Sequence, residues 1–170
     1  IAMLRLFKLS LSALLLATLV ACTDERTEVI PEVGIIERLE TVIPRDLAFH
    51  DTDRNEVRIG DLLNKPTILL LVYIRCPSIC SPLMHEVAHM VDKVELEAGK
   101  DFDLITLSFD PREDAPEQNE IIKRAKDVLL GDMKKKIPPE SWHFLTGAEE
   151  NIRKLCDTVG FYYQQDVNGD

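Results

Sequence analysis

Runs of apolar residues along the chain predict the strands of a buried sheet. Residues 67–74 (TILLLVYI) form a run of apolar and β-branched side chains without polar alternation. Such a run is typical of a central strand that is covered on both faces. Further strands are predicted at 102–109 (FDLITLSF) and 142–145 (WHFL), and the start of another at 161–164.

Apolar residues at helical spacing predict three helices between these strands. We expect the first from Pro82 to about Glu97, the second from Pro116 up to Gly131, and the third at 148–159, closed by Gly160. A turn cluster at 51–55 predicts a hairpin near 47–59. Strands that alternate with helices are typical of an α/β fold, in which the sheet carries helices on both faces.

The first residues have the pattern of an export signal. Arg5 and Lys8 precede an uncharged apolar stretch at 9–20, which is shorter than the roughly 20 residues that a membrane span needs. Residues 19–22 (LVAC) resemble the lipobox of bacterial lipoproteins, in which the Cys is lipidated and becomes the first mature residue.

We therefore expect a signal peptide at 1–21, a lipidated tether at 22–35 and a folded domain at 36–170. Lipid on Cys22 would anchor the domain to a membrane surface outside the cytoplasm, on the periplasmic side. Ordinary cleavage after a small residue and an uncleaved anchor are the alternatives.

Length and charge narrow the function classes. The chain has 170 residues, enough for one domain, and 45% of them are hydrophobic, as in globular proteins. Its 30 acidic and 20 basic residues give a formal net charge of −10. Nucleic-acid binding needs a basic face that displaces counterions from phosphate, so we expect no nucleic-acid partner.

Two cysteines lie where the first long strand meets the first helix, in the sequence CPSIC at 76–80. Sites in open α/β sheets form at the carboxyl ends of strands, and a helix N-terminus stabilises a thiolate. Cys76 and Cys80 could therefore exchange a disulfide or bind a soft ion such as Cu(I). An inert disulfide is the structural alternative, although so short a loop constrains little chain entropy. Cys156, on the apolar face of the third helix, is expected to be a buried hydrophobe.

Three motifs between residues 45 and 165 resemble those of the Sco/SenC family, in the family's order. The stretch 69–87 (LLLVYIRCPSICSPLMHEV) resembles its strand, C-P-x-x-C-P-like loop and helix. The stretch 108–117 (SFDPREDAPE) is similar to its S-x-D-P-x-x-D-T-P-E segment, and 142–147 (WHFLTG) matches W-x-F-L-T-G.

This resemblance implies a thioredoxin-like fold, with a central mixed sheet and helices on both faces. It implies copper binding through Cys76, Cys80 and a distant His. It further implies a role in metallating the dinuclear copper centre of cytochrome c oxidase, whose copper-site subunit would be the partner. Some members are thought to reduce that centre's cysteines; Cys76 and Cys80 would then be the catalytic pair and would form a disulfide. Asp110 occupies the family's acidic position near the metal loop and is expected to support the site.

The sequence departs from the family pattern at a few positions. Ser81 stands where the family often has Pro, and Ala115 replaces the usual Thr. The family's His ligand follows an aromatic segment that is 161–166 here, and no His occurs between that segment and Asp170. We expect the natural protein to continue past Asp170, with the third ligand and the last strands of the fold in that continuation.

Other chemistries remain as alternatives. The main one is a general extracytoplasmic thiol-disulfide oxidoreductase, in which Cys76 attacks and Cys80 resolves. Residues 85–89 fit the H-E-x-x-H pattern of zinc proteases, but catalytic zinc needs a third protein ligand, and the sequence offers no convincing one. Peroxiredoxin-like chemistry is disfavoured because Tyr73 replaces the Thr three residues before the Cys. His50, near the hairpin turn, is expected to be exposed.

Overall fold

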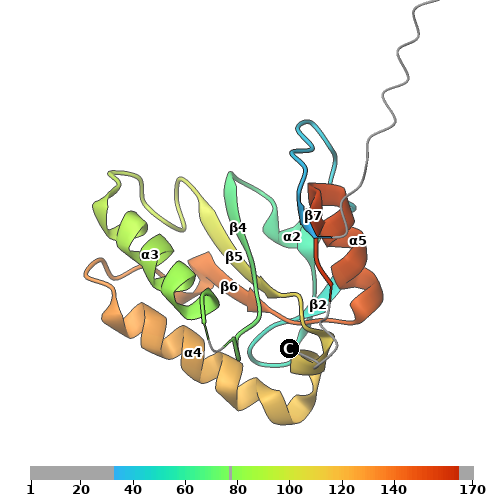
Figure 1. Ribbon diagram of the computed structural model, residues 1–170. Helices are drawn as coiled ribbons and strands as arrows, with labels where there is room; N and C mark the ends of the chain where they lie inside the picture. The colour runs from blue at the N-terminus through green and yellow to red at the C-terminus, as the bar shows by residue number, and fades with distance from the viewer. Residues whose placement is uncertain (1–32, 77, 165–170) are drawn as a thin grey trace, which may run out of the picture. The chain divides into compact units, whose positions relative to one another are not determined.

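The computed structural model describes residues 33–76 and 78–164 (Figure 1). The predicted signal peptide and the lipidation site Cys22 lie outside the described residues, and both stay predictions. In the described part of the chain, no helix is long and apolar enough to cross a membrane.

Three parallel strands form the central sheet, in the order β4, β5, β6. They span Thr67–Val72, Asp103–Ser108 and Trp142–Leu145. All six residues of β5, the middle strand, are buried, including the polar residues Asp103, Thr106 and Ser108. The register pairs Val72 with Ser108, so β4 and β5 end at the same level and share one carboxyl edge.

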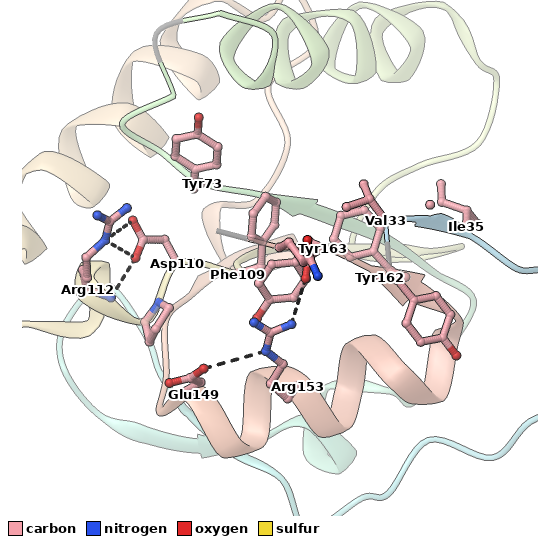
Figure 2. A pocket seen from close by; sticks show the side chains of 14 residues that line it. Val33, Ile35, Tyr73, Phe109, Asp110, Arg112, Glu149, Arg153, Tyr162 and Tyr163 are labelled. Carbon is pink, nitrogen blue, oxygen red and sulfur yellow. Dashed lines mark hydrogen bonds and ion pairs between the residues drawn. The ribbon is translucent and has the colours of Figure 1, made fainter. Parts of the chain in front are cut away.

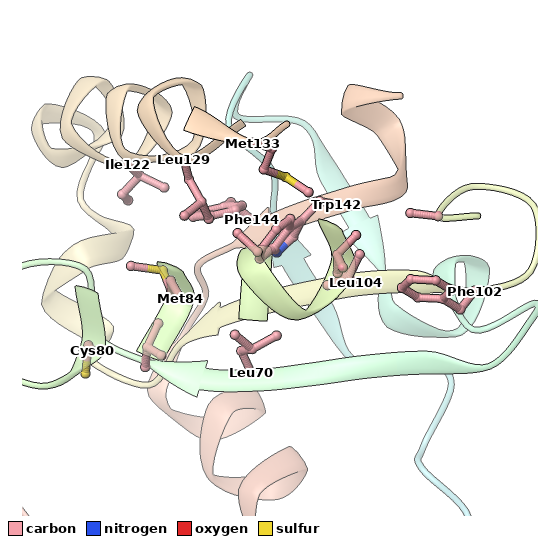
Figure 3. Packing of buried hydrophobic residues seen from close by; sticks show 14 residues of the cluster. Leu70, Cys80, Met84, Phe102, Leu104, Ile122, Leu129, Met133, Trp142 and Phe144 are labelled. Atoms are coloured by element: carbon pink, nitrogen blue, oxygen red, sulfur yellow. The ribbon is translucent and has the colours of Figure 1, made fainter. Parts of the chain in front are cut away.

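Helices α3 (Cys80–Lys93) and α4 (Asn119–Asp132) cover one face of the sheet. Figure 3 shows the cluster that joins them to the strands: Met84 from α3 and Ile122 and Leu129 from α4 lie around Leu70, Leu104, Trp142 and Phe144. The indole N–H of Trp142 donates to Thr106 Oγ1 at 2.9 Å, so these two buried polar groups satisfy each other.

Helix α5 (Glu149–Val159) covers the other face of the sheet. Its residues Ile152, Leu155 and Cys156 are fully buried, in one cluster with Ile105 and Leu107 of β5. Successive residues of a strand point to opposite faces, which is why Leu104 and Ile105 belong to different clusters. The expectation of helices on both faces is confirmed.

The antiparallel parts of the structure are short. The expected hairpin consists of β2 (Ala48–His50) and β3 (Glu56–Arg58), and the one-turn helix α2 (Ile59–Leu62) follows it. His50 bridges antiparallel to Thr146, directly after β6, and this isolated bridge links the hairpin to the parallel central sheet. Strand β1 (Gly34–Ile35), in the stretch predicted as a tether, pairs with β7 (Phe161–Tyr162).

Helix boundaries differ from the predicted ones where local turns intervene. α3 begins at Cys80, two residues before Pro82, and ends at Lys93 because Val94 is extended. Pro116 opens a short 3₁₀ turn, η2 (Pro116–Gln118), and α4 begins only after it. Gly131 lies inside α4 and does not end it, whereas Gly160 ends α5 as predicted, with a left-handed φ of 75°. Two further 3₁₀ turns are η1 (Pro111–Asp114) and η3 (Pro139–Ser141).

Two glycine substitutions should have opposite effects on stability. Gly160→Ala should lower the free energy of unfolding by about 2 kcal/mol or more. An L-residue is strained at this φ, and the new Cβ would collide with the Ile36 carbonyl oxygen.

Gly131→Ala should raise the free energy of unfolding by about 0.5 kcal/mol, because alanine favours the helix and the space around Gly131 is open. Urea unfolding measures both, and a Gly160→Ala protein as stable as the parent would contradict this account of the α5 C-terminus.

Candidate thiol site

The two predicted site cysteines lie at the carboxyl edge of the sheet. β4 ends at Val72, the chain turns with the Cys76 N–H donating to the Tyr73 carbonyl at 3.2 Å, and Cys80 is the first residue of α3. Cys76 is half-buried, whereas Cys80 is only 6% exposed. Both thiols are free in the structure, so the Cys76–Cys80 disulfide stays a prediction.

Cys76 lies among hydrogen-bond donors. Burial by itself would raise the pKa of its thiol. The backbone N–H groups of Cys80 and Ser78, the Tyr73 hydroxyl and the Cys80 thiol all bond to the sulfur and outweigh burial, lowering the pKa to about 6. A thiol with this pKa is largely thiolate at neutral pH, which is the nucleophilic and metal-binding form.

Cys80 has the opposite environment. Burial, the hydrogen bond and charge of Cys76 and the charge of Glu113 together raise the pKa of its thiol to about 11, and a hydrogen bond from the Tyr73 backbone only partly opposes them. The sulfurs of the two cysteines are hydrogen-bonded to each other. One short loop therefore holds a reactive thiolate against a protonated partner.

Asp110 follows β5 at the same carboxyl edge. Its carboxylate accepts hydrogen bonds from the backbone N–H of Arg112 at 2.9 Å and from the Arg112 Nε at 2.8 Å. Burial acts to raise the pKa of Asp110, but these bonds and the charges of Arg112 and Arg75 keep it lowered. Asp110 thus caps η1, and its predicted support of the metal loop stays a prediction.

An open cavity of about 380 Å³ lies beside the thiol loop (Figure 2). Aromatic side chains dominate its lining, with the Phe109 and Tyr163 ring centroids 4.8 Å apart. Tyr73 belongs to both places: its ring contacts Phe109 edge-on at 5.5 Å, and its hydroxyl bonds to Cys76. Figure 2 shows that hydroxyl pointing away from the other rings.

Sequence reasoning missed the acidic residues of η1. Glu113 is 1% exposed and bonds to the backbone that leads into the thiol loop. Asp114 Oδ1 lies 2.8 Å from His50 Nδ1, so His50 is bonded and half-buried, and the expectation of an exposed side chain was wrong. Both residues belong to the S-x-D-P-like segment, but a charged residue in a loop gives no sign of burial in the sequence.

The zinc-protease look-alike has no support in the structure. His85 and His89 are exposed on α3, beside a cavity of about 210 Å³. The nearby Asp92 carboxylate already accepts from the backbone N–H groups of Lys134 and Lys135. Among the described residues no three His, Cys, Asp or Glu side chains are grouped so as to hold a metal ion. The His ligand expected after residue 170 therefore stays a prediction.

Cys156 takes no part in the site. Its side chain is fully buried among the apolar residues of α5 and β5. This burial raises the pKa of its thiol to about 12. Its predicted character as a buried hydrophobe agrees with this environment.

Comparison with known proteins places these observations in a family. The SCO1/SenC family model matches residues 37–170. The chain is similar to Protein SCO1 homolog 1, mitochondrial, of Arabidopsis thaliana, with 28% identity over 114 residues. That match covers 66% of this chain but only 30% of the plant protein, so the chain spans less than a third of this relative's length.

Solved structures agree with the family match. A putative electron transfer protein from Aquifex aeolicus VF5 has a TM-score of 0.62 and 30% identity, covering 77% of this chain and 72% of that one. Arabidopsis thaliana ScoI, solved with copper bound, has a TM-score of 0.54 and 25% identity, covering 72% of this chain and 69% of that one. The expected thioredoxin-like fold is confirmed.

Thiol alkylation should reveal the asymmetry of the pair. In the reduced protein, iodoacetamide should modify Cys76 well before Cys80 and Cys156, with a reaction midpoint near pH 6. Tyr73→Phe should raise the midpoint by about one pH unit, since a hydrogen bond to a charged group is worth about 1.5 kcal/mol. Tyr162→Phe is the control, and mass spectrometry of the alkylated peptides is the measurement. Equal midpoints in the parent and Tyr73→Phe would contradict this assignment.

Proposed function

The chain belongs to the SCO1/SenC family, and from this premise we propose that it is a copper-binding assembly factor for cytochrome c oxidase. The observation that carries the proposal is the thiol pair, Cys76 and Cys80, with hydrogen-bonded sulfurs at the carboxyl edge of the sheet. The similarity to a ScoI protein solved with copper bound supports it.

The donor set suits Cu(I). Thiolates are soft ligands, and soft ligands select Cu(I) over harder ions. Two sulfurs that already contact each other in one loop can hold one ion without rearrangement of the sheet or of α3. Cys76 is the donor that needs least preparation, because its thiolate is already the main form at neutral pH.

Binding should displace protons in a defined way. Copper replaces the proton of Cys80, whose pKa is about 11, and below pH 6 also that of Cys76. The proton of Cys80 keeps the free protein from holding two adjacent negative charges. Its return would assist release of the ion to an acceptor.

Delivery of copper to the dinuclear site of cytochrome c oxidase is the leading form of the proposal. The partner would then be the copper-site subunit of the oxidase. Lipid on Cys22 would hold the domain at the periplasmic membrane surface where that partner lies. The net charge of −10 would influence how the two proteins approach each other.

Thiol-disulfide exchange is the second candidate, and the unequal pKa values of the pair favour it. The Cys76 thiolate would attack one sulfur of an acceptor disulfide, forming a mixed disulfide and releasing one acceptor thiolate. Cys80, after losing its proton, would attack the Cys76 sulfur and release the second thiolate. The acceptor gains two electrons, and Cys76 and Cys80 are left oxidised as a disulfide.

Copper titration with a colorimetric Cu(I) competitor tests the leading form. The reduced protein should bind one Cu(I), and its conditional affinity should rise about tenfold per pH unit between pH 7 and 10, because one proton leaves Cys80. Below pH 6 the slope should approach a hundredfold per unit. A flat pH dependence would contradict the assignment of Cys80 as a ligand.

Matched variants separate the pair from the remaining sulfur and nitrogen donors. Cys76→Ser and Cys80→Ser should each abolish tight Cu(I) binding, whereas Cys156→Ser and the double change His85→Ala, His89→Ala should retain it. An affinity no higher than that of a simple dithiol would leave exchange as the function. Exchange is then read from the rate at which the reduced protein reduces a disulfide peptide.

A further inference from the structure

Glu113 is a buried charge that the copper proposal does not yet use. Its carboxylate is 1% exposed, beneath the segment that joins β4 to the thiol loop. It accepts hydrogen bonds from the Ile74 N–H at 2.9 Å, from the Arg75 N–H at 2.8 Å and from the Ser108 hydroxyl at 2.6 Å. The Arg75 Nε lies 3.7 Å away.

These contacts fix the last residues before Cys76. β4 ends at Val72, and the N–H groups of Ile74 and Arg75 no longer belong to the sheet. Buried N–H groups without partners are costly, and a buried carboxylate needs several donors to offset its lost hydration. Each group therefore satisfies the other, and the path of the chain toward Cys76 follows from where Glu113 lies.

The position of Glu113 is itself fixed from two sides. Ser108, at the end of β5, holds one carboxylate oxygen. The next residue, Asp114, accepts from Thr146 Oγ1 at 2.7 Å and from Arg54 Nη1 at 3.0 Å, and contacts His50. The turn η1 is thereby tied to the hairpin and to the end of β6, and it presents Glu113 to the thiol loop as part of a rigid frame.

The loop geometry matters for the Cys76 sulfur because two of its hydrogen-bond partners are backbone groups of the loop. The N–H groups of Ser78 and Cys80 reach the Cys76 sulfur only while the loop keeps its path. The charge of Glu113 also lies close enough to disfavour ionisation of Cys80. The position of Glu113 thus favours copper binding, whereas its charge opposes it.

We propose that Glu113 is a positioning residue for the thiol pair: it sets the path of residues 74–75 and so holds the Cys76 sulfur against Cys80. This inference rests on the proposed copper binding for its main readout. Its structural content, the placement of Cys76, does not depend on copper.

Two substitutions separate length from charge. Glu113→Asp keeps the charge but withdraws the carboxylate by one methylene, and Cu(I) affinity at pH 7 should fall at least tenfold. Glu113→Gln keeps the length, leaves one oxygen to accept from either Ile74 or Arg75 and removes the opposing charge, and the loss should be smaller than in Glu113→Asp. Glu117→Gln, an exposed acidic residue of the same segment, is the control and should change nothing. An equal or larger loss in Glu113→Gln than in Glu113→Asp, or no loss in either, overturns the proposal.

A second readout needs no metal. The rate of Cys76 alkylation by iodoacetamide at pH 7 should fall in the same order, with Glu113→Asp slower than Glu113→Gln. If the parent binds Cu(I) no better than a simple dithiol but the alkylation order holds, copper binding fails and the positioning role stands. If the Glu113 variants do not fold, Ser108→Ala replaces them. It removes one donor to the carboxylate and should lower both the affinity and the alkylation rate about threefold, and unchanged values would overturn the proposal.

Discussion

Burial of β5 on both faces is the constraint on which the rest of the structure depends. A strand that is buried along its whole length needs a covering layer on each side, and the layers are α3 with α4 on one side and α5 on the other. Parallel pairing of β4 with β5 then requires a crossover connection, which α3 supplies. Because both strands end at one level, the loop that begins the crossover and the turn η1 after β5 meet at the same edge. The thiol pair and Glu113 come together for this reason.

The two cysteines at the carboxyl edge of the sheet have chemically different thiols. Cys76 stands in the loop, where N–H groups and the Tyr73 hydroxyl converge on its sulfur. Cys80 is already inside the first turn of α3, among the apolar residues of the cluster below it. Four residues of separation carry the chain from a polar environment to a buried one. The difference in pKa between the thiols therefore results mainly from the strand-to-helix junction, and the charge of Glu113 adds to it.

The sequence allowed the layers and the pair to be predicted, because in both cases the signal is local. The run at 67–74 is apolar since β4 lies in the sheet, and CPSIC falls at the junction that follows it. Tyr73 and Glu113 could not be found in this way. Tyr73 continues the apolar run and has no mark of its hydrogen bond, and Glu113 is a charged loop residue whose partners, at 74 and 75, lie nearly 40 positions away. His50 was misjudged for the same reason, since its partner Asp114 is 64 residues distant.

A high pKa at Cys80 limits how tightly this site can hold an ion. Deprotonating a thiol of pKa about 11 at pH 7 costs about 5 kcal/mol, which subtracts from whatever two sulfur–copper bonds provide. The buried negative charge of Glu113, which the half-exposed Arg75 guanidinium faces at 3.7 Å, adds to this cost. The frame thus combines placement of the two sulfurs with a penalty on deprotonating one of them, and this combination is compatible with either proposed use of the pair, since both copper binding and disulfide formation require Cys80 to lose its proton.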